Sequence, residues 1–430
     1  MIYAGDFLLS KIEKVYAREI LDSRGNPTVE VDVTTFCSDN STRGFGRASV
    51  PSGASTGSNE VLELRDKDNR YRGKGVRTAI HNINTNLGLE ILGMDVRRQR
   101  EIDQTLIDLD GTDNKSNLGA NAILGVSMAV ARAAADSFGM PLYQYLGGTN
   151  SFSLPVPTLN IINGGQHAGN DLAIQEFMIQ PKGAESFREA IRWAAETYHV
   201  LGDILKEKYG RSATNVGYEG GYAPPINNTT DALDAITDAI DEAGYTENDI
   251  TIGIDAAASS FFVNNKYDID DTHLTSGELM DFYIDMVRTY PIILIEDAFD
   301  EEAFNDFAAL TMEIPETIII GDDLFVTNVE RLRQGIELGA CNALLLKVNQ
   351  IGSLSEAFDA ATCAQHNGYA VVVSHRSAET EDNIIADISV ALGAELIKTG
   401  APARSERTGK YNQLIRIEEE LGVASQYMRI

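Results

Sequence analysis

Residues 292–297 have the sequence IILIED, a short apolar run that stops at two acidic residues. Five more apolar runs stop at an ionisable residue in the same way: TIGID (251–255), TIIIGDD (317–323), ALLLK (343–347), YAVVVSH (369–375) and ELIK (395–398). Such continuous apolar runs are typical of parallel strands that are buried on both faces. From Glu296 onward, the ionisable residues follow one another at intervals of 23–28 residues, enough for one strand, one helix and two loops. The pattern therefore predicts a series of βα units.

The position of the ionisable residues distinguishes the two folds that such units can build. In a closed (β/α)₈ barrel, the carboxyl ends of all strands meet at one rim, where the active site lies. In an open doubly wound sheet they lie along an edge, and only those at the switch point meet. Charged strand ends in succession favour the barrel. We therefore predict an α/β fold with a TIM-type (β/α)₈ barrel in its C-terminal part.

The first third of the chain has a different pattern. Residues 10–36 contain SKIEKVYAREIL, the turn SRGNP and the alternating stretch VEVDVTTF, which predict β-structure. Helical periodicity dominates from about residue 60 to residue 146. The segment LGGTNSFSLPVP (146–157) combines glycines and prolines without a helical pattern and is the best candidate boundary. We expect a small α+β N-terminal domain over residues 1–146 and the barrel over residues 147–430.

Composition and charge restrict the partners and the compartment. The 430 residues include 35 lysines and arginines against 64 aspartates and glutamates, which gives a net charge of −29. Such a surface repels nucleic acids and anionic membranes, so we expect neither nucleic-acid binding nor membrane insertion. A small anionic substrate would need a local positive cluster. The 3 cysteines are far apart, and the first residues lack the pattern of a signal peptide, so we expect a cytoplasmic protein.

Three carboxylates form a candidate metal site. Asp255, Glu296 and Asp322 stop neighbouring apolar runs, and like charges are costly to bring together unless a cation lies among them. Hard oxygen ligands with open positions suit Mg²⁺, which retains water and substrate oxygens. Each acid taken singly would instead be read as the cap of the helix that follows its strand. The recurrence at three strand ends favours the metal.

Basic residues end the later apolar runs. Lys347 and Lys398 are surface charges by default, but a lysine beside a metal and other cations would have a lowered pKa, as a general base requires. His375 is followed by Arg376 and Ser377, and the arginine fork suits a carboxylate or a phosphate. These residues supply the positive cluster that an anionic substrate needs.

Two glycine-rich segments and one apolar run add three further candidates. His167 lies in NGGQHAGN, Glu176 lies in IQEFMI, and Glu219 lies in VGYEGGYAPP, where it would be solvent-facing by default. The chemistry that this set suggests is proton abstraction next to a carboxylate, with metal and lysines neutralising the dianionic intermediate. A lysine base and a glutamic acid on opposite faces would allow anti elimination of water.

These motifs resemble the enolase family over nearly the whole chain. The matching segments include LDSRGNPTVEV (21–31), VPSGASTG (50–57), LGANAILGVSMA (118–129), PVPTLNIINGGQHAGN (155–170), LLLKVNQIG (344–352), VVSHRS (372–377) and IKTGAPARSERTGKYNQLIRIEEEL (397–421). The resemblance implies a small α+β domain before a modified barrel that opens ββαα and continues (βα)₆. It also implies a Mg²⁺-dependent lyase of glycolysis that interconverts 2-phosphoglycerate and phosphoenolpyruvate. Members of the family are homodimers or homo-octamers.

The resemblance further implies roles for single residues. Lys347 would be the base at C2, and Glu219 the general acid at the C3 hydroxyl. The first Mg²⁺ would be held by Asp255, Glu296 and Asp322, and Ser55 would help to hold a second Mg²⁺ that arrives with substrate. The remaining implied contacts are Glu176 beside the acid, His167, Arg376 and Ser377 near the phosphate, Lys398 and His375 around the carboxylate and the base, and Gln175 in the pocket.

Several positions depart from the family's usual residues. They are Tyr218 in place of aspartate, Asn59 in place of histidine, Ser260 in place of glutamate, Ala298 in place of proline and Ala378 in place of glycine. We expect the Tyr218 hydroxyl to donate to Glu219 and to weaken that acid. The departures leave open a related enzyme that acts on another phosphorylated or phosphonylated hydroxy acid. A non-catalytic binding protein is disfavoured because both Lys347 and Glu219 are present.

Overall fold

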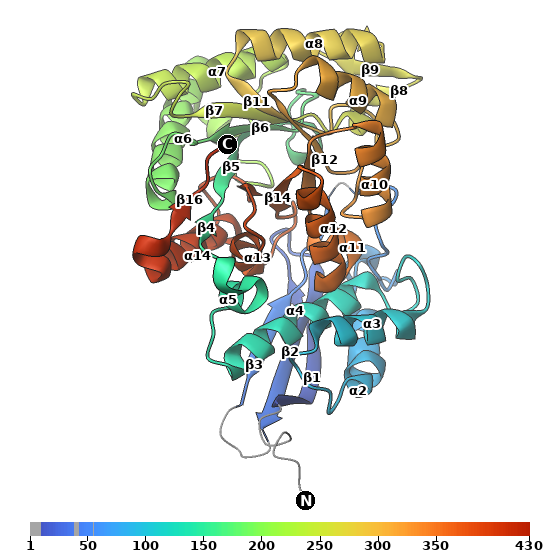
Figure 1. The fold of residues 1–430 in the computed structure, drawn as a ribbon. Coiled ribbons are helices and arrows are strands. Elements are labelled where there is room, and N and C mark those ends of the chain that lie inside the picture. Colours follow the sequence, from blue (N-terminus) through green and yellow to red (C-terminus); the bar gives the residue numbers. More distant parts are fainter. Residues whose placement is uncertain (1–9, 38–42, 55) are drawn as a thin grey trace, which may run out of the picture.

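The chain forms a small sheet covered by helices and, after it, a closed barrel (Figure 1). The structure is a computed structural model and describes residues 10–37, 43–54 and 56–430. The division that we propose near residues 146 and 147 falls in the last turn of α5 (Leu142–Gly147), between the sheet and the barrel.

The N-terminal sheet is antiparallel and has the order β1-β2-β3. Its strands are β1 (Ser10–Leu21), β2 (Pro27–Cys37) and β3 (Phe45–Ser49). The first two confirm the β-structure expected over residues 10–36, and β3 had no sequence prediction. The helices that follow are α1 (Arg77–Asn82), α2 (Gly88–Glu90), α3 (Gln99–Asp110), α4 (Ala120–Ser137) and α5.

The helical region starts later than its periodicity indicated. Residues near 60 are not α-helical, and α1 begins only at Arg77. The backbone of Leu62 is engaged elsewhere, because its N–H donates to the carbonyl of Asn114 and its carbonyl accepts from Ala120. These long-range bonds replace the local bonds of a helix and hold an extended segment against the start of α4.

Helix α4 is the core of the N-terminal part, and its alanine-rich sequence lets it approach the sheet closely. A Cβ on Gly46 of β3 would lie 2.0 Å from the carbonyl oxygen of Ala129, so only glycine fits at that crossing. No single helix of the described residues is long and apolar enough to cross a membrane, although α4 and residues 142–150, bent by 98°, pass that test as a pair.

The barrel closes in the order β11-β12-β13-β14-β15-β5-β6-β7. Its strands are β5 (Val156–Asn163), β6 (Glu176–Gln180), β7 (Thr251–Asp255), β11 (Ile292–Glu296), β12 (Ile318–Gly321), β13 (Ala343–Leu346), β14 (Ala370–Ser374) and β15 (Leu396–Lys398). Strand β6 is antiparallel to both its neighbours, and the other pairs are parallel. This arrangement confirms the α/β fold and the modified barrel.

The helices complete the order expected from the resemblance, ββαα followed by (βα)₆. They are α6 (Phe187–Tyr209), α7 (Thr229–Glu242), α8 (Ser276–Thr289), α9 (Phe304–Glu313), α10 (Val329–Leu338), α11 (Val348–Ile351), α12 (Leu354–His366), α13 (Ile384–Leu392) and α14 (Ser405–Leu421). Short strands outside the barrel are β4 (Ser153–Leu154), β8 (Phe262–Val263), β9 (Lys266–Ile269), β10 (Thr272–Leu274) and β16 (Gln426–Tyr427).

The interior of the barrel is apolar, and the ionisable side chains lie at one rim. Side chains such as Met178, Leu294 and Ile320 are fully buried and pack together between the strands. The strands then end at the ionisable residues that the apolar runs indicated. The barrel therefore presents its charged groups together at the carboxyl ends of its parallel strands.

Candidate active site

The predicted site residues meet at this rim of the barrel. Asp255 and Lys398 are the last residues of β7 and β15, and Lys347 directly follows β13. One cavity is lined by most of the predicted residues, namely His167, Gln175, Glu176, Glu219, Asp255, Asp322, Lys347, His375, Arg376, Ser377 and Lys398. Glu296 is fully buried and contacts Lys398. Ser55, predicted as a ligand of the second metal, lies outside the described residues.

The ammonium group of Lys398 lies among three carboxylates at the carboxyl ends of the barrel strands. Its Nζ is 2.8 Å from both oxygens of Glu296, 3.0 Å from Oδ2 of Asp255 and 3.2 Å from Oε2 of Glu176. Asp255 and Glu296 lie opposite each other in the pairing of β7 with β11, which is why one cation contacts both. Burial and the charge of Asp255 raise the pKa of Glu296 well above its ordinary value. These carboxylates therefore surround a cation position.

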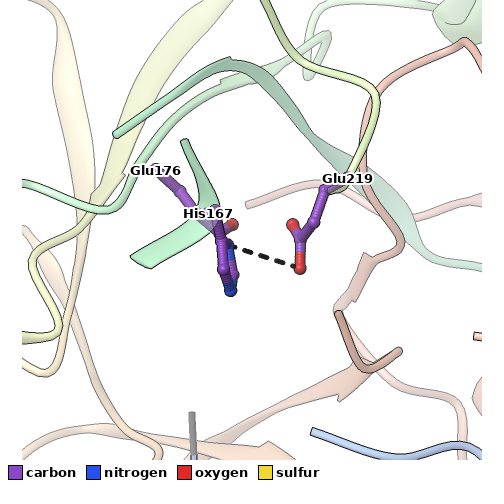
Figure 2. Close-up of side chains that lie close together, drawn as sticks. All are labelled: His167, Glu176 and Glu219. Carbon is purple, nitrogen blue, oxygen red and sulfur yellow. Dashed lines mark ion pairs between the residues drawn. The ribbon is translucent and has the colours of Figure 1, made fainter. Parts of the chain in front are cut away.

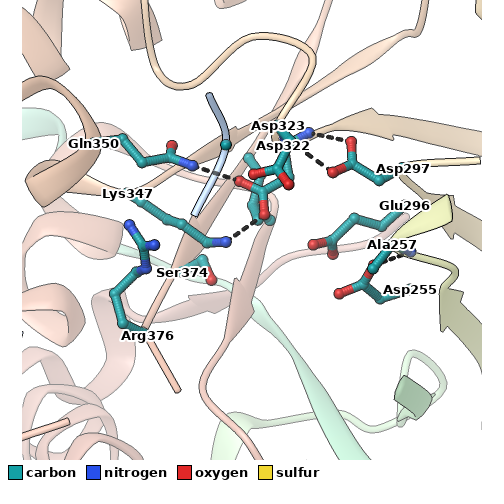
Figure 3. A network of polar contacts seen from close by, with 12 residues as sticks. Asp255, Ala257, Glu296, Asp297, Asp322, Asp323, Lys347, Gln350, Ser374 and Arg376 are labelled. Carbon is teal, nitrogen blue, oxygen red and sulfur yellow. Dashed lines mark hydrogen bonds and ion pairs between the residues drawn. The ribbon is translucent and has the colours of Figure 1, made fainter. Parts of the chain in front are cut away.

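Asp322 lies one strand further, and its carboxylate is held by two groups (Figure 3). Its Oδ2 pairs with the ammonium of Lys347, and its Oδ1 accepts from Nε2 of Gln350 at 2.8 Å. Burial is the largest effect and alone would lower the pKa of Lys347, but the charges of Asp322 and Glu296 together raise that pKa. The low pKa expected of this lysine would therefore require a cation near it.

Asp297 anchors the turn that carries Asp322. Its two carboxylate oxygens accept the backbone N–H groups of Asp322 and Asp323, each at 2.9 Å (Figure 3). Burial and the charge of Asp323 raise the pKa of Asp297 well above its ordinary value, and burial and Asp322 raise the pKa of Asp323 to about 7. Both acids line the cavity. In the sequence, each of these two acids directly follows a predicted metal ligand, Asp297 after Glu296 and Asp323 after Asp322. Only the first acid of each pair was predicted to belong to the site.

Metal-binding side chains gather tightly at two places in the described part of the chain. Within each group the ligand atoms lie within 4.8 Å of one another: His167 with Glu176 and Glu219, and Asp297 with Asp322 and Asp323. The predicted metal trio is not one of these groups, because Asp255 and Glu296 surround Lys398 while Asp322 pairs with Lys347. The acidic side of the cavity nevertheless has the hard oxygen ligands that a divalent cation requires.

The opposite wall of the cavity carries His167, Glu176 and Glu219 (Figure 2). Nδ1 of His167 lies 3.4 Å from Oε1 of Glu176 and 3.7 Å from Oε1 of Glu219. Burial and the like charge of Glu219 raise the pKa of Glu176 to about 7. Burial alone would lower the pKa of His167, but the two glutamates outweigh it and raise that pKa. Glu176 and His167 therefore both hold a proton more strongly than usual.

The loop that carries Glu219 is clamped from several sides. It lies between α6 and α7, and the N–H of Tyr222 donates to the carbonyl of Ile161 on β5. Gly220 has a φ of +86°, and a Cβ there would lie 2.8 Å from the carbonyl oxygen of Ala403, so the tight turn requires glycine. The hydroxyl of Tyr198 donates to the carbonyl of Gly220 at 2.8 Å. The Glu219 carboxylate is therefore fixed at the cavity wall rather than exposed.

The expected hydrogen bond from Tyr218 to Glu219 is wrong. Tyr218 is 43% exposed, and the partner seen for the Glu219 carboxylate is the amide of Asn160, whose Nδ2 donates to Oε2 at 3.1 Å. The backbone of Tyr218 is engaged instead, because its N–H donates to His167 and its carbonyl accepts from Arg407. Anchoring of the main chain leaves the ring on the outside of the loop.

Arg376 and Ser377 join the barrel to the chain on either side of the predicted second-metal ligand, Glu60 after it and Ala54 before it. The guanidinium of Arg376 donates to both carboxylate oxygens of Glu60, at 2.9 and 3.0 Å, and to Oδ1 of Asn349 at 3.0 Å. The hydroxyl of Ser377 accepts from the N–H of Ala54 at 2.6 Å. A carboxylate thus occupies the arginine fork that was predicted to bind an anionic group.

Four residues that contact the predicted site residues from distant segments were not predicted from the sequence. Asn160, Arg407, Gln350 and Glu60 bind predicted residues directly but carry no local pattern that distinguishes them. Asn160 lies inside the apolar run PVPTLNII, and a buried polar residue in a barrel strand was the available signal.

Two family models cover nearly all of the chain. The enolase N-terminal domain matches residues 12–146, and the enolase C-terminal TIM barrel domain matches residues 151–429. Among curated proteins, the enolase of Methanococcoides burtonii is 70% identical over 420 residues, 97% of this chain and 97% of that protein. The enolase of Methanosarcina barkeri is 69% identical, covering 98% and 97% of the two chains, and that of Thermococcus kodakarensis is 61% identical, covering 96% of each.

Proposed function

The chain belongs to the enolase family, and from this premise we propose which of its residues perform each part of the family's reaction. The protein is a phosphopyruvate hydratase, a hydro-lyase of glycolysis that interconverts 2-phosphoglycerate and phosphoenolpyruvate. Its family implies a divalent metal. The assignment of Mg²⁺, of two ions per site and of individual residue roles is our proposal.

Lys347 is the base that removes the C2 proton. Its ammonium lies just after the end of β13, largely enclosed and against Asp322. A cation bound to Asp322 would compete with the lysine for that carboxylate and so lower the pKa of Lys347. Burial of the ammonium acts in the same direction. The pairing thus supports a base that becomes active when the metal site fills.

Glu219 is the general acid that protonates the leaving C3 hydroxyl. In the closed strand order, β13 and β6 are four strands apart in either direction, so they lie on opposite sides of the barrel. Lys347 follows β13, and Glu219 lies beside Glu176 at the start of β6. A substrate between them would lose its proton on one face and its hydroxyl on the other. This opposition is the observation that carries the proposal, because anti elimination requires it.

Asp255, Glu296 and Asp322 fit a resident Mg²⁺. They are buried carboxylates, and the contact of the Lys398 ammonium with Asp255 and Glu296 supports a cation position at these two acids. Bound there, the metal would supply positive charge to the substrate carboxylate as it becomes dianionic. Ser55 remains our candidate for the second ion. In the bound state Lys398 would contact the substrate carboxylate. His375, expected with it around the carboxylate and the base, faces Glu219 at 3.3 Å, and Gln175 borders the same pocket.

The phosphate site comprises Arg376, Ser377 and His167. The Arg376 fork already holds the carboxylate of Glu60 in a two-point contact, and a phosphate presents oxygens with the same spacing to that fork. Binding of substrate would therefore exchange one anion for another. Glu176 supports the acid by sharing protons with His167 and Glu219.

Chelation followed by reconstitution tests the metal proposal. Treatment with a strong chelator should abolish formation of phosphoenolpyruvate from 2-phosphoglycerate, measured by ultraviolet absorbance, and Mg²⁺ should restore it. Full turnover in excess chelator would contradict the metal assignment.

We also propose a cytoplasmic homodimer or homo-octamer that binds neither nucleic acid nor membrane. The reduced state of Cys341 and Cys363 supports a reducing compartment. Exposed Tyr16, Phe36 and Phe45 in the N-terminal sheet support burial against a second copy. Light scattering of the purified protein tests the assembly, and a monomer would contradict it.

A further inference from the structure

Arg407 is a fully buried arginine at the edge of the active site. It lies in the first turn of α14, and one of its terminal nitrogens is 2.6 Å from Nδ1 of His375. The same nitrogen donates to the carbonyl of Arg376 at 2.6 Å, and the other donates to the carbonyls of Ser377 and Tyr218 at 2.7 and 3.1 Å. The guanidinium thus connects the segment after β14 with the loop that carries Glu219.

The contact with His375 determines where the imidazole carries its proton. A guanidinium has five N–H donors and no acceptor, and it stays protonated in proteins. Nδ1 of His375 can therefore only accept at this contact, and it carries no hydrogen. The ring hydrogen is then on Nε2, and a second ring proton would place two donors 2.6 Å apart.

Nε2 of His375 faces the general acid. It lies 3.3 Å from Oε2 of Glu219 without forming a hydrogen bond, and contacts between catalytic groups often tighten only in the complex with substrate. Oε2 accepts from Nδ2 of Asn160 at 3.1 Å. Oε1 faces Nδ1 of His167 at 3.7 Å instead (Figure 2). Oε2 of Glu219 thus accepts from the Asn160 amide and lies next to Nε2 of His375, whereas Oε1 faces His167.

We propose that Arg407 is a positioning residue that fixes His375 as the neutral Nε2–H tautomer, so that His375 and Asn160 hold Oε2 of Glu219 and leave Oε1 to carry the transferred proton. The inference rests on the proposed role of Glu219 as the general acid. It gives His375 the task of a hydrogen-bond donor and removes it from the groups that gain or lose a proton during the reaction.

The electrostatics around His375 agree with a neutral ring. Burial is the largest effect and lowers the pKa of His375 to about 3; Arg407 and Lys398 act in the same direction, and Glu219 acts against them. Burial alone would raise the pKa of Glu219, but the facing histidines lower it well below its ordinary value. A neutral His375 can still lower that pKa through its N–H, and His167 and Arg407 act in the same direction through their charge.

The tautomer can be read directly in the resting protein. Solid-state ¹⁵N NMR of protein labelled at its 6 histidines resolves protonated from unprotonated ring nitrogens, and the His375 signals are those missing from His375→Gln. We expect an unprotonated Nδ1 and a protonated Nε2 near pH 7. A protonated Nδ1, alone or with Nε2, would overturn the proposal. The measurement needs neither metal nor substrate, so its outcome is independent of whether the proposed catalytic roles are correct.

Two substitutions of His375 test what the tautomer does. The amide nitrogen of glutamine occupies the place of Nε2, whereas that of asparagine is too short to reach Glu219. We expect turnover of His375→Gln to exceed that of His375→Asn by roughly tenfold, the value of one hydrogen bond to a charged group, with equal rates of C2 hydrogen exchange. Equal turnover in the two variants, or exchange that falls in parallel with turnover, would show that His375 does not act through Glu219.

Discussion

The ammonium of Lys398 lies 2.8 Å from both carboxylate oxygens of Glu296. Glu296 is fully buried and Asp255 adjoins it, so without a cation these acids would be costly to ionise. Burial would lower the pKa of Lys398, but Asp255, Glu176 and Glu296 outweigh it and raise that pKa well above its ordinary value. The lysine therefore neutralises these carboxylates and would compete with a metal for them.

Removing this lysine should make the fold more dependent on metal. In chelator, Lys398→Met leaves buried acids unpaired, and we expect a loss of stability of about 3–5 kcal/mol, seen as a lower Tm. Added Mg²⁺ should then raise the Tm more in this variant than in the wild type, because a ligand that binds only the folded state stabilises it. Lys410→Met is the control, since Lys410 forms a buried pair with Glu379 at 2.8 Å away from the proposed metal ligands. Equal Mg²⁺ shifts in Lys398→Met and the wild type would contradict this account.

The Arg376 fork should determine substrate affinity. Arg376→Lys keeps the charge but loses the two-point contact now made with Glu60, so we expect KM for 2-phosphoglycerate to rise roughly tenfold or more. Steady-state kinetics provides the measurement. Arg333→Lys, which alters an exposed pair with Glu330, serves as the control and should leave KM unchanged. An unchanged KM in Arg376→Lys would remove this residue from the phosphate site.

Tyr218 should contribute little to turnover despite its position next to Glu219. Its side chain is 43% exposed, and the contacts that the structure gives to this residue are made by its backbone. We expect Tyr218→Phe to change kcat by less than about twofold, within the range of ordinary surface substitutions. A much larger fall in kcat would show that the hydroxyl reaches Glu219 during the reaction.

How far the sequence predicted the molecule depended on whether the signal was local. Apolar runs that stop at Asp255, Glu296 and Lys347 predicted both the barrel and the acids and bases at its rim, because burial of a strand on both faces produces consecutive apolar residues. The contact of Glu60 with Arg376 spans 316 positions and could not be predicted from spacing. The predicted direction of the Tyr218 side chain was wrong for a related reason, because main-chain hydrogen bonds to other segments determine the loop conformation.

Asp387 should give the fold a pH dependence of its own. It is buried on α13, and burial raises its pKa to about 6, above the value of about 3.9 in an unfolded chain. The folded state therefore binds more protons than the unfolded state in this range, and this residue's contribution to stability falls as pH rises from about 4 to about 6.

The variant Asp387→Asn should remove that contribution. Its free energy of unfolding, from denaturant titrations, should increase relative to the wild type between pH 4 and pH 6 and then level off. Ser389→Ala, a neutral change on the same helix, controls for lost packing and should show a difference that does not vary with pH. A constant difference for Asp387→Asn would contradict the sign of this argument.

The division of roles between Lys347 and Glu219 is the central claim, and hydrogen exchange at C2 tests it most directly. In D₂O with Mg²⁺, exchange of the C2 hydrogen of 2-phosphoglycerate and formation of phosphoenolpyruvate are followed in the same sample. Lys347→Ala should lose both by about 10²–10⁴-fold, because the base acts first. Glu219→Gln should lose phosphoenolpyruvate formation by a similar factor but retain exchange. Exchange at the wild-type rate in Lys347→Ala, or its complete loss in Glu219→Gln, would contradict the assignment of base and acid.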